Sequence, residues 1–235
     1  MDMPPARQLT PEPPGPSRSN RAPLWEPFIH GLSSRFRRAR ARRILRLFPD
    51  IANGRVCDLG GSLHFWETVA GIIDCGDLTI LNISQDGQSK SRGGDDRCRI
   101  TLYDGQHIPF PDRHFDTLLC NSVIEHVPPA HRSSLCAEMR RVSKRIVLQT
   151  PAFGFPIEPH FVLPCLHWLP RSIGRKLAFI SPWRVLSQPP PGHLKIYFDE
   201  ITLLRRSDLQ ALFPELRIVT ERFIGLPKSY LIIGP

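Results

Sequence analysis

The sequence lacks several features that mark common protein classes. Its six cysteines include no C-x-x-C pair and no spacing typical of metal ligands, which argues against a disulfide-bonded scaffold or a zinc module. No apolar run reaches the length of a membrane-spanning helix. The N-terminal residues contain no apolar core of a secretory signal. We therefore expect a cytoplasmic location, with peripheral contact to the inner face of a membrane as an open alternative.

Acidic residues are scarce in the first part of the chain, and this imbalance explains most of the net charge of +9. Residues 1–46 contain ten arginines and three acids, whereas the rest of the chain contains 21 basic and 19 acidic residues. The main body therefore gives no reason to predict a nucleic-acid partner. The basic stretch 35–46 is interpreted either as a solvated helix or as a segment that contacts an anionic membrane.

Prolines are concentrated at the N-terminal end of the chain. The first 27 residues contain eight of the 25 prolines and almost no apolar periodicity. This composition is typical of an extended or disordered segment. We predict a disordered, proline-rich arm over residues 1–33 and one folded domain over residues 34–235.

The domain alternates apolar strand patterns with helical patterns. Alternation of this kind predicts parallel strands joined by right-handed crossovers. A capped helix beginning at Ser207 follows, and then two strands around a turn at Leu226–Pro227. The predicted fold class is therefore α/β, with an antiparallel C-terminal hairpin. The earlier strands are predicted at residues 54–60, 78–84, 97–104, 114–122 and 144–150, with helices at residues 65–73 and 133–143.

Residues 152–186 interrupt this alternation. They are apolar, aromatic and broken by prolines, which excludes a regular strand–helix unit. We interpret them as an insertion of short helices over the carboxyl edge of the sheet, where parallel sheets bind their ligands. The insertion is expected to be a lid, an acceptor pocket or a face that touches a membrane.

The most specific motif is the segment of residues 104–127, DGQHIPFPDRHFDTLLCNSVIEHV. It contains an acid, Asp104, then a Pro-Phe pair, a Phe-Asp pair that opens a strand, and the pair Glu125–His126 after that strand. The segment resembles the type 11 branch of the class I S-adenosylmethionine-dependent methyltransferases. The resemblance implies a Rossmann-like fold, with a seven-stranded, mostly parallel sheet and helices on both faces. It also implies S-adenosyl-L-methionine as the cofactor.

The resemblance further implies which residues bind the cofactor. Two departures from the family pattern affect this set. Ser62 and His64 stand where the family has glycines, although Ser62 is suited to cap the next helix. Asn82 replaces an acid that accepts hydrogen bonds from the ribose, so we expect a weaker ribose contact unless Asp86 substitutes for it. The implied set lies at successive strand ends and comprises Asp58, Gly60, Gly61, Asn82, Asp104, Gly105 and Asn121.

Two pairs of residues are candidates for a general base that removes a proton from the methyl acceptor. Glu158 and His160 follow the fifth strand and, in an extended stretch, are predicted to point the same way. Glu125 and His126 follow the fourth strand. The resemblance places acceptor residues after the fifth strand, which favours Glu158 and His160. The cysteine and histidine spacing predicts no metal-ligand set.

Three functions are weighed for the chain. The first is methyl transfer to a small-molecule, saccharide or lipid-linked acceptor. The second is a catalytically inactive relative that serves as a binding or partner subunit. The third, a nucleotide-dependent oxidoreductase, is disfavoured because the G-x-G-x-x-G motif is absent and the second strand lacks an acid for the ribose.

Overall fold

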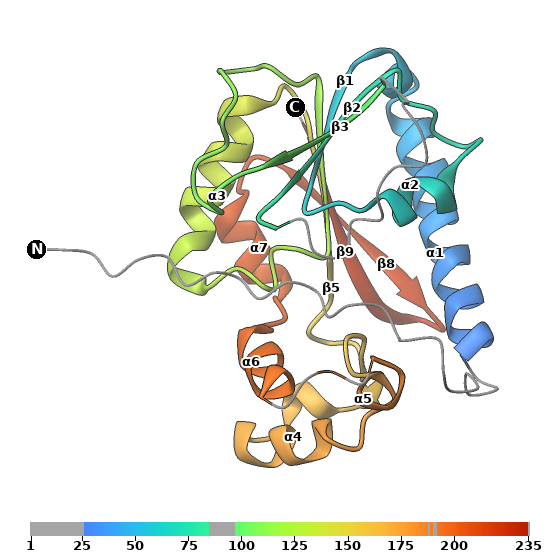
Figure 1. The fold of residues 1–235 in the computed structure, drawn as a ribbon, viewed down its shortest axis with the longest axis vertical. Coiled ribbons are helices and arrows are strands. Elements are labelled where there is room, and N and C mark those ends of the chain that lie inside the picture. Colours follow the sequence, from blue (N-terminus) through green and yellow to red (C-terminus); the bar gives the residue numbers. More distant parts are fainter. Residues whose placement is uncertain (1–25, 85–96, 188, 190–191, 235) are drawn as a thin grey trace, which may run out of the picture.

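The main sheet has seven strands in the order β3-β2-β1-β4-β5-β9-β8 (Figure 1). The computed structural model describes residues 26–84, 97–187, 189 and 192–234. Strands β1 to β5 are parallel to one another, and β9 is antiparallel to both of its neighbours. This arrangement confirms the predicted fold class. The strands are β1 (Arg55–Leu59), β2 (Asp77–Asn82), β3 (Cys98–Leu102), β4 (Thr117–Asn121), β5 (Ile146–Pro151), β8 (Arg217–Phe223) and β9 (Leu226–Gly234).

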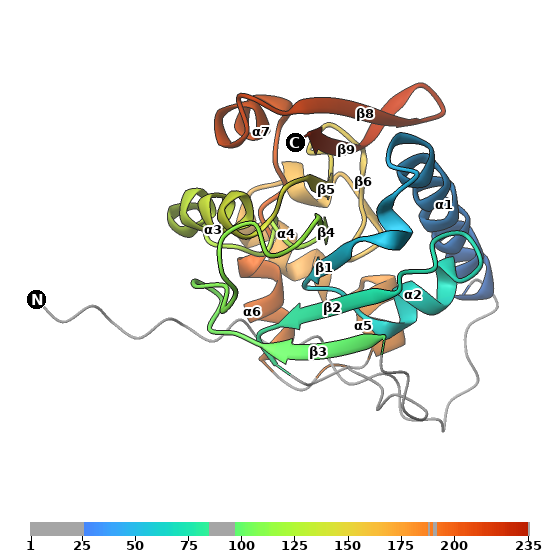
Figure 2. The ribbon, with the colours of Figure 1, turned by 90° about the horizontal axis from the view of Figure 1, so that it is seen from above.

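Helices cover both faces of this sheet, as predicted (Figure 2). On one face lie α1 (Glu26–Leu47), the short η1 (Ile51–Asn53) and α2 (Leu63–Val69); on the other lie α3 (Pro129–Val142) and α7 (Arg206–Leu212). The central strands β4 and β5 are buried almost throughout, which explains their continuous aliphatic sequences. Each face has its own apolar core, and together these cores fix the positions of the strand ends.

The first helix begins earlier than the sequence predicted. Because α1 starts at Glu26, residues 26–33 are helical and do not belong to a disordered arm, while residues 1–25 lie outside the described residues. Pro27 was counted with the arm, but it lies in the first turn, where a helix tolerates proline because the N–H groups there have no intrahelical acceptor. The helix is tied to the sheet by Arg40, whose Nη2 lies 2.9 Å from Oε2 of Glu221 in β8.

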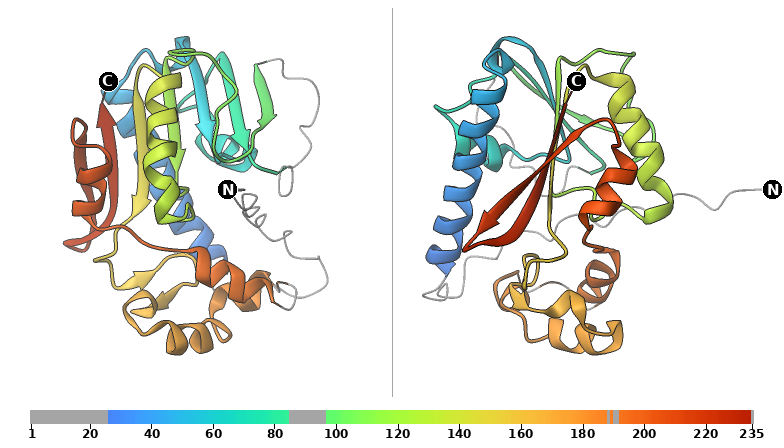
Figure 3. Two further views of the ribbon diagram at one scale, coloured as in Figure 1. Left: turned by 90° about the vertical axis from the view of Figure 1, so that its left-hand side faces the viewer. Right: turned by 180° about the vertical axis from the view of Figure 1, so that it is seen from behind.

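The described residues between 152 and 204 form a smaller layer beyond the carboxyl ends of the parallel strands (Figures 1 and 3). We call this layer the cap. The sequence predicted only short helices over residues 152–186, whereas the structure adds a two-stranded pair, and a further helix extends the layer beyond that range. The cap contains β6 (Ile157–Glu158), β7 (Leu163–Pro164), η2 (Leu166–Trp168), α4 (Arg171–Ala178), α5 (Pro182–Ser187) and α6 (His193–Glu200).

Two local predictions near the C-terminus were wrong. The N-cap of α7 is Arg205 and not Ser207, and the Asp208 carboxylate accepts the Arg205 N–H at 2.8 Å. The hairpin turn lies at Ile224–Gly225, both with positive φ, while Leu226–Pro227 opens β9. Glycine adopts positive φ readily, whereas the fixed φ of proline suits the strand. In the part of the chain that the structure describes, no helix combines the length and apolarity needed to span a membrane.

Candidate active site at the carboxyl edge of the sheet

The turn after β1 can be formed only with glycine at two positions. Gly60 has a φ of +69°, and a Cβ added there would lie 2.4 Å from Cγ2 of Val123. A Cβ on Gly61 would lie 1.9 Å from Oδ2 of Asp58. Both distances are far below van der Waals contact, so neither position accepts a side chain and the backbone of this turn is bare.

The two positions at which the family pattern has further glycines do not require them. Ser62 has an extended backbone and is the N-cap of α2, where its Oγ accepts the Phe65 N–H at 3.3 Å. The predicted capping role of Ser62 is therefore confirmed. His64 lies in the first helical turn, and its side chain is 69% exposed. Ordinary side chains fit both conformations, so neither substitution disrupts the turn.

Two buried oxygen atoms beside the turn have no hydrogen-bond partner among the described residues. The Trp66 indole N–H donates to Oδ2 of Asp58 at 2.8 Å, but Oδ1 of Asp58 has no donor. Oδ1 of Asn121, at the end of the neighbouring β4, also lacks a donor. Burial raises the pKa of Asp58 to about 7. Buried acceptors without donors are rare in folded proteins, and they mark a place where a ligand with N–H groups fits.

Asn82, at the end of β2, is hydrogen-bonded to the same turn. Its Nδ2 donates to the carbonyl oxygen of Gly61 at 2.8 Å. The amide therefore fixes the conformation of the glycine turn and presents its Oδ1 as the remaining acceptor. Asp86, the proposed substitute for an acid at this position, lies outside the described residues.

Asp104, after β3, supports a tight turn of its own. One carboxylate oxygen, Oδ1, accepts the backbone N–H groups of Gln106 and His107 at 2.8 and 2.7 Å. These hydrogen bonds hold the pKa of Asp104 below its ordinary value. Gly105 has a φ of +81°. The side chain is exposed and ionised at the edge of the sheet, with its second oxygen outside this turn.

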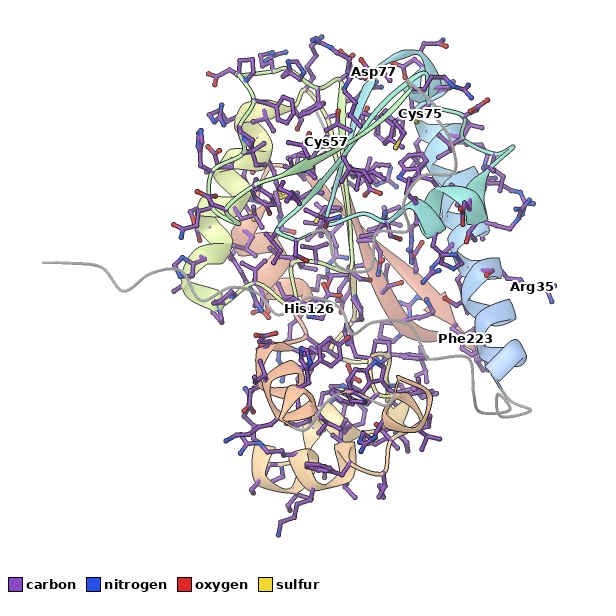
Figure 4. The ribbon with its side chains drawn as sticks, in the orientation of Figure 1. Arg35, Cys57, Cys75, Asp77, His126 and Phe223 are labelled. Carbon is purple, nitrogen blue, oxygen red and sulfur yellow. The ribbon has the colours of Figure 1, made fainter. Side chains whose placement is uncertain are left out.

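The two pairs of residues that were predicted as alternative general bases lie in one cluster. Glu125 and His126 come from the segment after β4, and Glu158 and His160 come from β6 and the turn after it. Nδ1 of His160 lies 2.6 Å from Oε1 of Glu158, and its Nε2 lies 3.7 Å from Oε1 of Glu125. Figure 4 places the labelled His126 where the sheet meets the cap.

A tight turn, and not an extended stretch, brings Glu158 and His160 together. Glu158 ends β6, and residues 159–162 form a turn that leads into β7. Oε2 of Glu158 accepts the Phe161 N–H at 2.7 Å, which leaves Oε1 for the imidazole. Burial opposes ionisation of Glu158, but His160 and the hydrogen bonds to the carboxylate hold its pKa below the ordinary value. The expected extended conformation was wrong, and the turn is what orients the carboxylate.

The other side of the cluster is a buried carboxyl group. Glu125 is fully buried, and Oε2 accepts the Thr150 hydroxyl at 3.0 Å. Its Oε1 has no hydrogen-bond partner among the described residues. Burial raises the pKa of Glu125. Burial and the charge of a protonated His160 lower the pKa of His126 to about 3, so His126 is neutral near pH 7.

Aromatic rings from the cap cover the cluster. The sequence pattern predicts no individual role for these rings. The Tyr197 ring in α6 stacks on His126, with centroids 5.8 Å apart, and meets His160 edge-on at 6.2 Å. The Trp183 ring in α5 stacks on Tyr197 at 4.8 Å. No local sequence pattern indicates Tyr197. Its contact with His126 depends on the packing of α6, which is distant from His126 in the sequence.

The cluster also includes a set of potential metal ligands that sequence spacing did not reveal. One ligand atom each from Glu125, His126 and His160 lie within 4.8 Å of one another. His126 is neutral, as a metal-ligating imidazole must be. Sequence spacing does not indicate this set, because its members come from two segments that are distant in the sequence.

Comparison with known proteins finds one matching family model and many similar folds. Residues 61–146 match the family model described as "Methyltransferase domain", of the type 11 methyltransferases. Over this segment the chain resembles the class I methyltransferases. The matched segment begins inside the glycine turn, at Gly61, and ends at the start of β5.

Solved structures show the same fold over most of the chain. Magnesium protoporphyrin IX methyltransferase from Synechocystis, with bound SAH, aligns with a TM-score of 0.55 and 10% identity over 92% of this chain and 88% of that chain. SAM-dependent methyltransferases from Aquifex aeolicus and Archaeoglobus fulgidus both align with TM-scores of 0.51, at 12% and 14% identity. Each covers 88% of this chain, and the alignments span 96% and 98% of those chains. No curated protein matches the sequence.

Proposed function

We propose that this chain transfers a methyl group from S-adenosylmethionine to an acceptor held between the sheet and the cap. One observation carries the proposal: the glycine turn after β1 and the Glu158–His160–Glu125 cluster lie at the same carboxyl edge of one sheet. Methyl transfer is an in-line displacement, so the donor and the acceptor must meet at one place. This edge has a glycine turn for the methyl donor and a cluster of acidic and histidine side chains for the acceptor.

The residues at the edge fit this cofactor. The bare backbone at Gly60–Gly61 admits the methionine end, and the unpartnered Oδ1 atoms of Asp58 and Asn121 are matched to an ammonium group. Oδ1 of Asn82 is proposed to accept a ribose hydroxyl, and Asp104–Gly105 to contact the adenine. When bound, the cofactor supplies a methyl group on a positively charged sulfur, which needs no further activation.

His160 is proposed to take the proton from an acceptor hydroxyl or ammonium group. In this role Nδ1–H of His160 donates to Glu158, which fixes the tautomer and leaves Nε2 as the basic atom. A hydroxyl at hydrogen-bond distance from both Nε2 and Oε1 of Glu125 fits their separation of 3.7 Å. Glu158 orients the base and stabilises the imidazolium that forms.

The acceptor is proposed to be a partly apolar small molecule or a lipid-linked molecule. The rings of Tyr197 and Trp183 provide flat apolar surface beside the cluster. A saccharide stacks on such rings as well, but the cap core around Phe161 offers mainly apolar groups. We therefore rank a saccharide below the other two.

The test is transfer of a radiolabelled methyl group from S-adenosylmethionine to a cell extract, measured with the wild type and two histidine variants. His160→Ala should lower the transfer rate by roughly two to four orders of magnitude and leave cofactor affinity nearly unchanged. His167→Ala is the matched control, because this cap histidine binds the Phe153 carbonyl outside the cluster. It should lower the melting temperature and retain the rate per folded molecule.

Two outcomes would redirect this account. If wild-type protein binds neither S-adenosylmethionine nor S-adenosylhomocysteine, the inactive-relative hypothesis replaces catalysis. If a chelator removes activity and a divalent cation restores it, then Glu125, His126 and His160 are metal ligands and not a proton-accepting cluster. Under the proposed mechanism, the chelator leaves the rate unchanged.

A further inference from the structure

The cap contains a long stretch without acidic residues. Residues 159–198 include no aspartate or glutamate, and they carry the basic residues Arg171, Arg175, Lys176, Arg184 and Lys195. Outside this stretch and the arginine-rich residues 1–49, the chain mixes both signs, as soluble surfaces usually do. A surface of one sign over this length indicates a partner of negative charge.

The same layer exposes many large apolar side chains. Ile180 is 71% exposed and Phe179 is 57% exposed, and both lie in the link between α4 and α5. Others lie along η2, α4, α5 and α6: Trp168, Leu169, Ile173, Leu177, Val185 and Ile196. Scattered single apolar residues need no explanation, but a concentration of this kind marks an interaction surface.

A surface helix normally buries its large apolar side chains and exposes polar ones, but helix α4 exposes large apolar side chains and buries small residues. Its buried positions include the small residues Gly174 and Ala178, whereas Ile173 and Leu177, one turn apart, face outward. A Cβ on Gly174 would lie 2.8 Å from Cζ of Phe198, so α4 packs closely against α6 through its small residues. The larger apolar surface of α4 is thus directed away from the protein.

Basic groups accompany this apolar surface. Arg171 and Arg175 are held by Asp199, through its carbonyl and its carboxylate respectively. Lys176 and Lys195 are exposed on the same layer. Apolar residues of this size flanked by lysines, with no acid between them, match the interface of an anionic bilayer, where side chains insert and ammonium groups meet headgroups.

We propose that the cap binds anionic lipid bilayers through α4 and the Phe179–Ile180 link. Figures 1 and 3 show α4 at the end of the molecule farthest from the sheet, where a flat surface can approach it. A second copy of this chain is a poorer occupant, because two surfaces that each carry an excess of basic groups repel each other. The proposal stands apart from catalysis, since bilayer binding is measured without cofactor or acceptor.

The test is sedimentation of the full-length protein with vesicles of phosphatidylcholine alone or with 30% phosphatidylglycerol, at about physiological salt. The wild type should sediment with the anionic vesicles and much less with the neutral ones. Ile173→Ser/Leu177→Ser/Ile180→Ser should weaken binding at least tenfold. The matched control Leu47→Ser/Ile224→Ser/Leu226→Ser changes three exposed apolar residues outside the cap and should bind like the wild type.

A second measurement separates the cap from the basic helix α1. Trp168 is exposed in the cap, so vesicles with brominated acyl chains should quench the protein's fluorescence, and Trp168→Phe should lose that quenching. Three results would overturn the proposal: no binding to anionic vesicles, equal binding of the triple cap variant, or binding without Trp168-dependent quenching. Wild-type dimers that the triple cap variant abolishes would assign the face to a second copy instead.

Discussion

Asn82 ties the end of β2 to the glycine turn after β1. Its Nδ2 donates to the Gly61 carbonyl at 2.8 Å, so the side chain at this position needs a donor as well as an acceptor. An aspartate here would place a carboxylate oxygen against the carbonyl oxygen. The family pattern alone suggests that an acid improves the ribose contact, but the geometry indicates that the acid would disturb the turn.

We therefore expect Asn82→Asp to weaken S-adenosylhomocysteine binding by about 1–3 kcal/mol, the usual cost of losing a partner for a buried polar group. Asn82→Ala serves as the control, because it removes the hydrogen bond without adding a charge. Calorimetry should rank the affinities as wild type, then Asn82→Ala, then Asn82→Asp. Tighter binding by Asn82→Asp would show that the ribose contact outweighs the bond to Gly61.

Asp58 gives the fold an unusual pH dependence. Burial raises its pKa from 3.8 to about 7, so between these values the folded protein binds a proton that the unfolded chain has released. Stability consequently falls as the pH rises through this range, and it levels off above the folded pKa. The sign is opposite to that of a carboxylate held by a salt bridge.

Melting temperatures of the cofactor-free protein between pH 4.5 and 8 test this linkage. Relative to Asp58→Asn, the wild type should lose stability from pH 4.5 to about 7, by an amount on the order of a few kcal/mol. Asparagine keeps the acceptor for the Trp66 indole N–H and does not ionise. A difference between the two proteins that does not vary with pH would refute the raised pKa.

At the scale of secondary-structure elements, one ion pair holds α1 against the edge hairpin. Arg40 is 7% exposed, and its guanidinium meets the Glu221 carboxylate, which also accepts the Ser229 hydroxyl at 2.6 Å. Burial opposes the charge on Glu221, but Arg40 and Ser229 keep its pKa below the ordinary value. Removing either partner alone leaves the other charge poorly solvated.

Arg40→Met should lower the free energy of unfolding by about 3 kcal/mol, as expected for breaking a buried pair. The double variant Arg40→Met/Glu221→Met should recover much of that loss, because it leaves no unpaired charge. Arg42→Met, at an exposed position of the same helix, provides the control. Urea denaturation measures all four proteins, and equal stabilities of Arg40→Met and Arg42→Met would show that the pair contributes nothing.

At the scale of the whole molecule, the sheet could be predicted because its central strands are buried on both faces. Short runs rich in apolar residues in β1, β2, β4 and β5, separated by helical periodicity, leave few topologies open. The start of α1 could not be predicted, because Pro27 extends the proline-rich composition into the first helical turn. The β6–β7 pair was also missed, since two-residue strands have no periodicity to detect.

The candidate site was predictable only in part. The strand-end residues Asp58 and Asn82 followed from position along the sheet. Their hydrogen bonds to Trp66 and Gly61 did not, because they depend on the exact path of the turn. The contact between Glu125 and His160 depends on the turn after β6. The contact of α6 with this cluster depends on how the chain folds back within the cap. Such long-range contacts leave no local pattern in the sequence.

The bare glycine turn after β1 is proposed to hold S-adenosylmethionine. Calorimetric titration with S-adenosylhomocysteine of the wild type, Gly61→Ala and Gly76→Ala tests it most directly. A Cβ at Gly61 would lie 1.9 Å from Asp58, whereas a Cβ at Gly76 meets nothing closer than 3.8 Å. We expect one saturable site in the wild type and Gly76→Ala, and at least tenfold weaker binding in Gly61→Ala. No binding by the wild type, or equal affinity of the two variants, would contradict it.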